Sequence, residues 1–203
     1  MSRPKKCGDV GQAFPIYITV VGGLLLLALA YLAVGQAGAT RSKAQTAADA
    51  AALAAALETR DQLVDQWVTH ILDPDSWQAI FDGKVPISDT CWRAQQLGAR
   101  NDASVTCRPD GLLGYTVLAE TNDPVGDTIV PGTETQKATE SATAVIESRC
   151  SFQLPSEDTG GAELPSLSCK GEQWDLRPDD LTDLPQPEDL FDVHLAESPT
   201  SDE

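Results

Sequence analysis

The sequence predicts an α+β protein: a long N-terminal transmembrane helix extended by an Ala-rich helix, then a small domain of short helices and a three-stranded antiparallel sheet, with an acidic disordered tail. Three observations support this. Phe14–Val34 is an almost unbroken apolar run, Arg41–Glu58 is rich in alanine, and the apolar spacing changes from helical to alternating after Asn101. We divide the 203 residues into a leader at 1–12, a helix at 13–58, an exported domain at 59–153 and a tail at 154–203.

The apolar run has the length of a membrane span. A helix of that length measures about 31 Å, close to the roughly 30 Å of a bilayer's hydrocarbon core. No charged residue lies between Asp9 and Arg41. Alanine is the best helix former, and neither Gly nor Pro follows Arg41 until Pro74, so the helix should continue beyond the membrane surface.

Charge placement predicts the orientation of this helix. Arg3, Lys5 and Lys6 precede the span, whereas Arg41 and Lys43 follow it, which favours a cytoplasmic N-terminus. A secretory signal peptide cleaved at Ala37-Gly38-Ala39 is the structural alternative. The apolar run is longer than the usual signal peptide core, and alanine-rich helix continues across that site, so we favour an anchor in the cell membrane with an extracytoplasmic domain.

Small residues on the helix predict close packing against another helix. The extramembrane alanines favour this interpretation, since an unpaired solvated helix would carry more charge. The expected packing positions are Gly35, Ala44, Ala47, Ala48, Ala51 and Ala55. The alternative is that Gly and Ala are simply common in membrane helices.

The exported domain shows three helical and three extended segments. Arg60–Leu72 has the spacing of an amphipathic helix, a short turn of helix follows at Ser76–Phe81, and Thr90–Arg100 reads as a third helix. Extended segments follow at Ser104–Cys107, Tyr115–Glu120 and Ala138–Glu147. A Pro-Asp-Gly turn between the first two predicts a hairpin, and the third alternates Ala142, Ala144 and Ile146 on one face.

Four cysteines on the exported side predict a disulfide framework. They allow three connectivities, of which we favour Cys91 with Cys107 and Cys150 with Cys169. A zinc site is the functional alternative, but the sequence has no C-x-x-C and only two histidines, His70 and His194. We therefore expect no metal and no cofactor.

Composition argues against several function classes. A net charge of −17 disfavours nucleic acid and anionic membrane surfaces as partners. The chain has no phosphate-binding loop, dinucleotide fingerprint or G-x-S-x-G, so we expect neither an enzyme nor a small-molecule substrate. Lys170–Glu203 is too polar to form a core and is interpreted as a solvated acidic tail, with a partner motif at Trp174 or Leu190-Phe191 as the alternative.

The N-terminal segment resembles a known family. It resembles the N-terminal module of TadE/TadG-like proteins of tight-adherence (Flp-type) pilus assembly, and looks like an actinobacterial member, through Gly11-Gln12-Ala13-Phe14-Pro15-Ile16, the apolar helix and the block Gln45–Ala56. A looser similarity covers 88–147, including Ala94–Asn101. The resemblance implies a minor pseudopilin processed after a glycine, here between Gly11 and Gln12. Ile16 would then stand where pilins usually carry Glu, so an uncleaved TadG-like anchor is equally admissible.

The resemblance implies a non-enzymatic component of a Flp/Tad-type pilus or related secretion apparatus, anchored in the membrane or incorporated as a minor pseudopilin, and acting by helix–helix packing. Its expected partners are the membrane and other pilins or assembly proteins, with a cell-surface pilus as a further location. The alternative is a single-span anchored extracytoplasmic binding domain outside any filament. A secreted enzyme would require removal of the helix.

Overall fold

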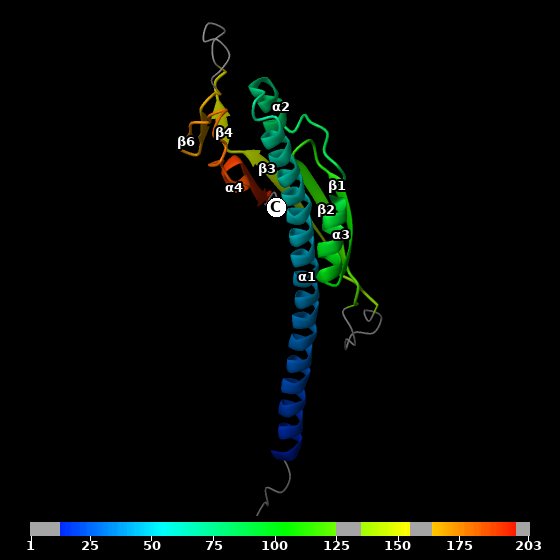
Figure 1. Cartoon of the computed structure of the whole chain (residues 1–203). Coiled ribbons are helices and arrows are strands. Elements are labelled where there is room, and N and C mark those ends of the chain that lie inside the picture. The colour runs from blue at the N-terminus through cyan, green and yellow to red at the C-terminus, as the bar shows by residue number, and fades with distance from the viewer. Residues whose placement is uncertain (1–12, 125–134, 155–163, 198–203) are drawn as a thin grey trace, which may run out of the picture.

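One helix runs through most of the molecule and carries the folded domain at one end (Figure 1). The computed structural model describes residues 13–124, 135–154 and 164–197. The helix α1 spans Ala13–Thr69, 57 residues without a break. The helical segment expected separately at Arg60–Leu72 is therefore the end of α1 as far as Thr69, with a turn after it, and the position after Glu58 lies inside this helix. The absence of Gly and Pro from Arg41 to Asp73 explains this continuity.

Short helices and two antiparallel sheets complete the fold, which confirms the predicted α+β class. The short helices are η1 (Pro74–Ser76), α2 (Trp77–Phe81), α3 (Cys91–Arg100) and α4 (Pro187–Leu190). The main sheet has the order β1-β2-β3-β7, with strands at Ala103–Pro109, Gly114–Thr121, Thr139–Ser148 and Phe191–Leu195. The smaller sheet has the order β4-β5-β6, with strands at Cys150–Phe152, Leu167–Cys169 and Glu172–Trp174.

The predicted hairpin forms between β1 and β2. Its turn has Gly111 at φ +73°, a conformation that glycine adopts without strain, and the Asp110 amide donates to the Gly114 carbonyl. The third predicted strand is β3, which pairs antiparallel with β2. Along β3, Ala144 and Ile146 are buried and Ala142 is half-buried, as the alternation predicted.

The expectation of a disordered tail was wrong for part of the segment after Leu154. That segment supplies β5, β6, α4 and β7, so the main sheet has four strands where we expected three. Leu190 and Phe191 are fully buried against the core, and Phe81 packs on Phe191 with ring centroids 5.5 Å apart. Leu190 and Phe191 therefore bury enough apolar surface to order this segment, although its composition as a whole is acidic.

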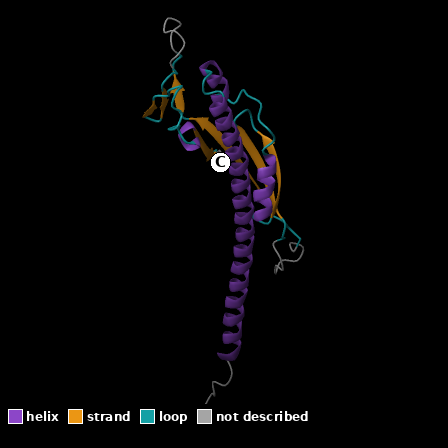
Figure 2. Cartoon of the chain, in the orientation of Figure 1, coloured by secondary structure: helices purple, strands orange, loops and turns teal. Residues whose placement is uncertain are grey.

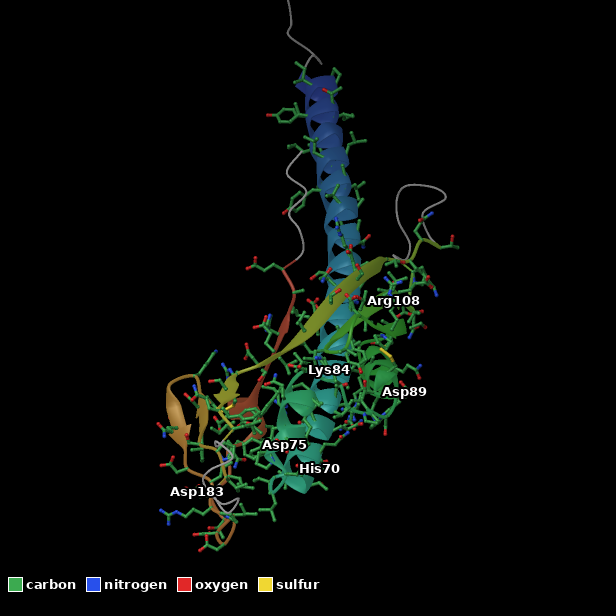
Figure 3. The ribbon with its side chains drawn as sticks, turned by 90° about the horizontal axis from the view of Figure 1, so that it is seen from above. His70, Asp75, Lys84, Asp89, Arg108 and Asp183 are labelled. Carbon is green, nitrogen blue, oxygen red and sulfur yellow. A yellow bond between two sulfur atoms is a disulfide. The ribbon has the colours of Figure 1, made fainter. Side chains whose placement is uncertain are left out.

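The helices α1 and α3 lie over the same face of the main sheet (Figure 2). The core between them is closed at its distal end by Trp67, Trp77 and Phe152, whose rings pack edge to face or tilted. Asp75, Asp183 and the exposed His70 lie at this end of the molecule, away from the apolar half of α1 (Figure 3).

Candidate helix-packing surfaces

One face of α1 is an alanine seam that the chain's own sheet covers. The alanine seam has no exposed surface and comprises Ala44, Ala47, Ala48, Ala51, Ala52, Ala55 and Ala56. Its membrane-proximal part meets Ala103 and Ala119, with Ala142 at the margin, so that methyl groups lie on both sides of the contact. Side chains this small let the helix axis approach the sheet closely.

The structure thus changes the partner expected for Ala44, Ala47, Ala48, Ala51 and Ala55. We expected these methyl groups to contact helices of neighbouring chains. In the structure they are fully buried where α1 packs on the main sheet and on α3 of the same chain, which leaves them no free surface for a helix of a second chain. Gly35, the remaining expected packing position, lies outside the domain on the exposed part of α1.

A buried polar cluster fixes α1 against the domain one turn beyond the alanine seam. The Thr59 hydroxyl lies 2.8 Å from the Tyr115 hydroxyl and 3.1 Å from the Thr90 hydroxyl, and all three side chains are buried. They come from α1, β2 and the residue preceding α3. Sequence reasoning missed this cluster, because a threonine or tyrosine in an amphipathic pattern does not reveal its partner.

The other half of α1 is an apolar rod that nothing in the described chain covers. Leu24, Leu25, Leu26 and Leu27 each keep more than half of their surface exposed, and Tyr31 is 83% exposed. The rod is long and apolar enough to cross a membrane. Because its leucines point in every direction around the axis, water would be an unfavourable surrounding and hydrocarbon a favourable one.

The apolar rod contains four glycines, which have no side chain to keep a neighbouring helix at a distance. A methyl group added at Gly22, Gly23, Gly35 or Gly38 would meet no atom of the chain within 4 Å. Close approach of a second helix is therefore sterically open at these positions. Gly11 and Gln12, the expected processing site, lie outside the described residues.

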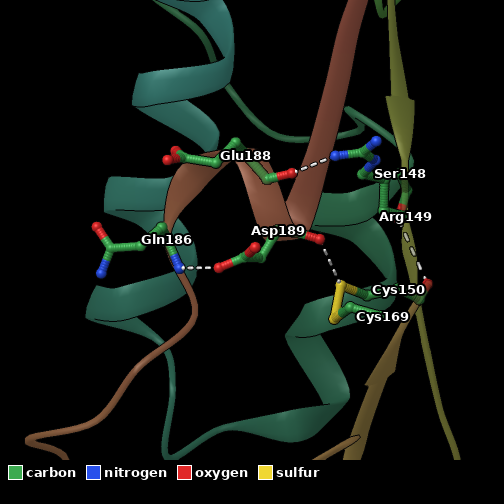
Figure 4. The surroundings of a disulfide bond; sticks show 7 residues. All are labelled: Ser148, Arg149, Cys150, Cys169, Gln186, Glu188 and Asp189. Carbon is green, nitrogen blue, oxygen red and sulfur yellow. Dashed lines mark hydrogen bonds between the residues drawn. A yellow bond between two sulfur atoms is a disulfide. The ribbon is translucent and has the colours of Figure 1, made fainter. Parts of the chain in front are cut away.

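Both disulfides have the favoured pairing. Cys91–Cys107 joins α3 to β1, with the two Cα atoms 5.6 Å apart, and Cys150–Cys169 joins β4 to β5. Around the second bridge, the Arg149 guanidinium donates to the Glu188 carbonyl at 2.7 Å, which ties α4 to the end of β3 (Figure 4). The first bridge therefore links α3 to the main sheet, the second lies within the smaller sheet, and neither constrains the apolar rod.

Polar side chains in the described part of the chain do not assemble a reactive site. Within the ranges 13–124, 135–154 and 164–197, no cluster of three His, Cys, Asp or Glu has the geometry to hold a metal ion. Hydrogen bonds from Lys84 and Gln78 lower the pKa of Asp82, and those from Thr182 lower the pKa of Asp180. Asp180 is exposed and Asp82 is half-buried, and both carboxyl groups stay ionised at neutral pH, which suits a solvated surface.

A cavity of about 520 Å³ lies beside β6 and the loop that follows it. Trp174, Arg177, Asp180 and Asp183 contribute to its lining. The Asp180 carboxylate within it already accepts two hydrogen bonds from Thr182. The cavity is therefore a polar surface hollow rather than an apolar ligand pocket.

Comparison with known proteins assigns the N-terminal segment. Residues 11–58 match the Tad family, described as "Putative Flp pilus-assembly TadE/G-like". This segment is TadE/G-like. The match confirms the resemblance inferred from the Gly11–Ile16 string and the alanine block, and it covers the apolar rod and the alanine seam but not the rest of the folded domain.

No curated protein and no solved structure matches the chain. The TadE/G-like segment and the membrane-length helix together support the description of this protein as a membrane component associated with a Tad pilus.

Proposed function

We propose that the protein is a non-enzymatic, single-span membrane component of a Flp-type pilus or related secretion apparatus. The observation that carries this proposal is the division of α1 inside one TadE/G-like segment. Its first half is an exposed apolar rod, and its second half is buried in a folded domain. A continuous helix between the two holds the domain at a fixed distance from the membrane.

The proposed orientation has residues 1–12 in the cytoplasm and the domain outside. The basic residues before the span and the two disulfides beyond it favour this arrangement. A reporter enzyme that is active only outside the cytoplasm, fused after Ser148, should be active in cells. Activity of a cytoplasm-specific reporter at the same site would contradict the orientation.

The N-terminal residue of the mature protein distinguishes a processed pseudopilin from an uncleaved membrane anchor. Intact mass and N-terminal peptide mapping of the native protein should give Gln12 for a processed pseudopilin and Met1 or Ser2 for an uncleaved anchor. A start at Thr40 would mean that the span is removed, which would refute the membrane role.

Helix packing with partners would use the exposed rod, since the alanine seam is already occupied. The four glycines are the sites of closest approach, and Gly35 is the one of them that the sequence analysis names as a packing position. In native membranes, Gly35→Leu should reduce co-purification of the protein with pilus assembly proteins. Leu32→Ala, which adds no bulk on the same rod, is the matched control and should co-purify normally.

An anchored binding domain outside the filament is the second candidate. The burial of the alanines inside the chain's own domain favours this candidate. The second half of α1 then offers little helical surface for packing in a filament. Normal co-purification of Gly35→Leu, with Met1 or Ser2 as the N-terminus, would favour this candidate.

A further inference from the structure

The end of the folded domain nearest the apolar rod contains a cavity of about 280 Å³, which we call the basal cavity. It lies between α1, the end of α3 and the end of β2, on the side of the domain from which the rod emerges (Figure 1). The residues that line it all belong to the described part of the chain, and they are Thr40, Lys43, Arg100, Asn101, Asp102, Thr121, Asp123 and Pro124.

The basal cavity combines charges of both signs. Lys43 and Arg100 supply two cations, and Asp102 and Asp123 supply two carboxylates. All four residues are exposed, and within the described residues none of them forms an ion pair. The cavity therefore has no net charge, and its own cations and carboxylates do not neutralise each other by direct contact.

The turn between α3 and β1 places two of these charges at the cavity. The Asn122 amide donates to the Asp102 carbonyl at 2.8 Å, and the Asn101 side-chain amide donates to the Leu97 carbonyl at 2.8 Å. Asp102 has φ +53°, a left-handed conformation that aspartate adopts more readily than most residues. These contacts fix the backbone on both sides of the turn, so Arg100 and Asp102 stay beside α1.

The basal cavity lies at the height of the lipid headgroups. Thr40 and Lys43 follow the end of the apolar run at Val34 by six and nine residues, which places them about 9 and 14 Å beyond it along the helix. The headgroup layer extends about 5–8 Å beyond the hydrocarbon core on each side. Long Lys and Arg side chains bend toward this layer. With Val34 at the edge of the hydrocarbon core, the cavity therefore borders the headgroups.

We propose that the basal cavity binds the headgroup of a zwitterionic phospholipid that carries a primary ammonium group. Lys43 and Arg100 donate to the phosphate, and the carboxylates of Asp102 and Asp123 accept from the ammonium. A headgroup without net charge matches the cavity, whereas the chain's net charge of −17 would repel an anionic lipid. This inference rests on the proposed membrane span, and it adds a lipid ligand that the span by itself does not require.

Lipid retention by the full-length protein tests the proposal. The protein is prepared in phosphatidylcholine micelles that contain equal amounts of phosphatidylethanolamine and phosphatidylglycerol, and native mass spectrometry identifies the retained lipid. We expect one retained phosphatidylethanolamine, at least about fivefold above each of the other two lipids. Phosphatidylcholine has no N–H group to donate to the carboxylates, and phosphatidylglycerol has no ammonium group.

Three variants separate the roles of the charges, and all three positions are exposed, so the domain should stay folded. Lys43→Gln and Arg100→Gln should each reduce retention of phosphatidylethanolamine about fivefold. Asp123→Asn should remove much of the preference over phosphatidylcholine. Arg108→Gln is the matched control with unchanged retention, because it removes an exposed cation of β1 that does not line the cavity.

Several outcomes would overturn the proposal. Equal retention of the three lipids, or a preference for phosphatidylglycerol, would refute the zwitterionic headgroup. An equal loss in Arg108→Gln would mean that the overall charge of the domain acts instead of the cavity. Displacement of the lipid by millimolar inorganic phosphate would indicate a site for a free anion. The reporter fusion and the mature N-terminus test the span itself, so failure of the lipid site and failure of the proposed function remain distinguishable.

Discussion

The two halves of α1 share one helix and differ in what surrounds them. From Pro15 to Val34 the large apolar side chains are exposed around the whole helix, whereas from Ala44 to Ala56 one face has no exposed surface at all. The backbone is the same, and both halves are rich in apolar residues. Side-chain size and distribution therefore decide the environment: leucine on every side suits lipid, and alanine on one side suits a closely packed sheet.

This comparison assigns different sensitivities to the two halves. Substitutions on the alanine seam should act on the stability of the folded domain. Substitutions at the glycines of the rod should leave that stability unchanged and act on association within the membrane. The following experiments probe the difference from the largest expected effect to the smallest.

Ala51→Arg should have the largest effect. Ala51 is fully buried in the alanine seam, where the described residues offer no partner for a cation. Burying that charge or displacing α1 should lower the free energy of unfolding on the order of 4 kcal/mol. Thermal unfolding of the full-length protein in micelles would measure it. Thr46→Arg, at an exposed position of the same helix segment, is the control, and an equal loss there would refute the buried seam.

Removal of the Cys91–Cys107 disulfide should rank second. The bridge closes a separation of 16 residues between α3 and β1, so replacing both cysteines with serine should cost about 3 kcal/mol. Replacement of Cys150 and Cys169, separated by 19 residues, should have a similar effect. Non-reducing peptide mapping of the native protein checks the pairing, and four free thiols would contradict both the bridges and the extracytoplasmic location.

Thr59→Val should have a smaller effect, about 1–3 kcal/mol, because it leaves the buried hydroxyls of Thr90 and Tyr115 without their shared partner. Urea unfolding of the full-length protein would measure this loss. Thr69→Val is the matched control, since the Thr69 hydroxyl bonds only to its own helix at the Asp65 carbonyl and is exposed. Equal stability of the two variants would mean that the buried cluster does not fix α1 to the domain.

The local elements could be predicted from the sequence because their signals are local. The turn at Asp110-Gly111 and the alternation in β3 each appear in a few consecutive residues. The cysteine pairing also followed from neighbouring positions. β7 was missed because Phe191, Val193 and Leu195 alternate within a segment whose acidic composition predicted disorder.

The partner of the alanine seam could not be predicted for a physical reason. A row of methyl groups on a helix indicates that another structural element packs closely against it. A helix of another chain and a strand of the same chain could each be that element. The decisive residues were Ala103 and Ala119, small side chains on β1 and β2 that complement Ala47 and Ala48. In the sequence these two look like ordinary strand positions.

Thermal melting of two full-length variants, Ala48→Leu and Gly35→Leu, tests the central claim most directly. Both add bulk to α1, one on the alanine seam and one on the apolar rod, where a methyl group at Gly35 would meet no atom within 4 Å. Overpacking the seam should lower the melting temperature of the domain by about 5 °C or more, whereas Gly35→Leu should leave it unchanged. A normal melting temperature for Ala48→Leu, or an equal decrease for both variants, would contradict the division of α1 into a membrane half and a domain half.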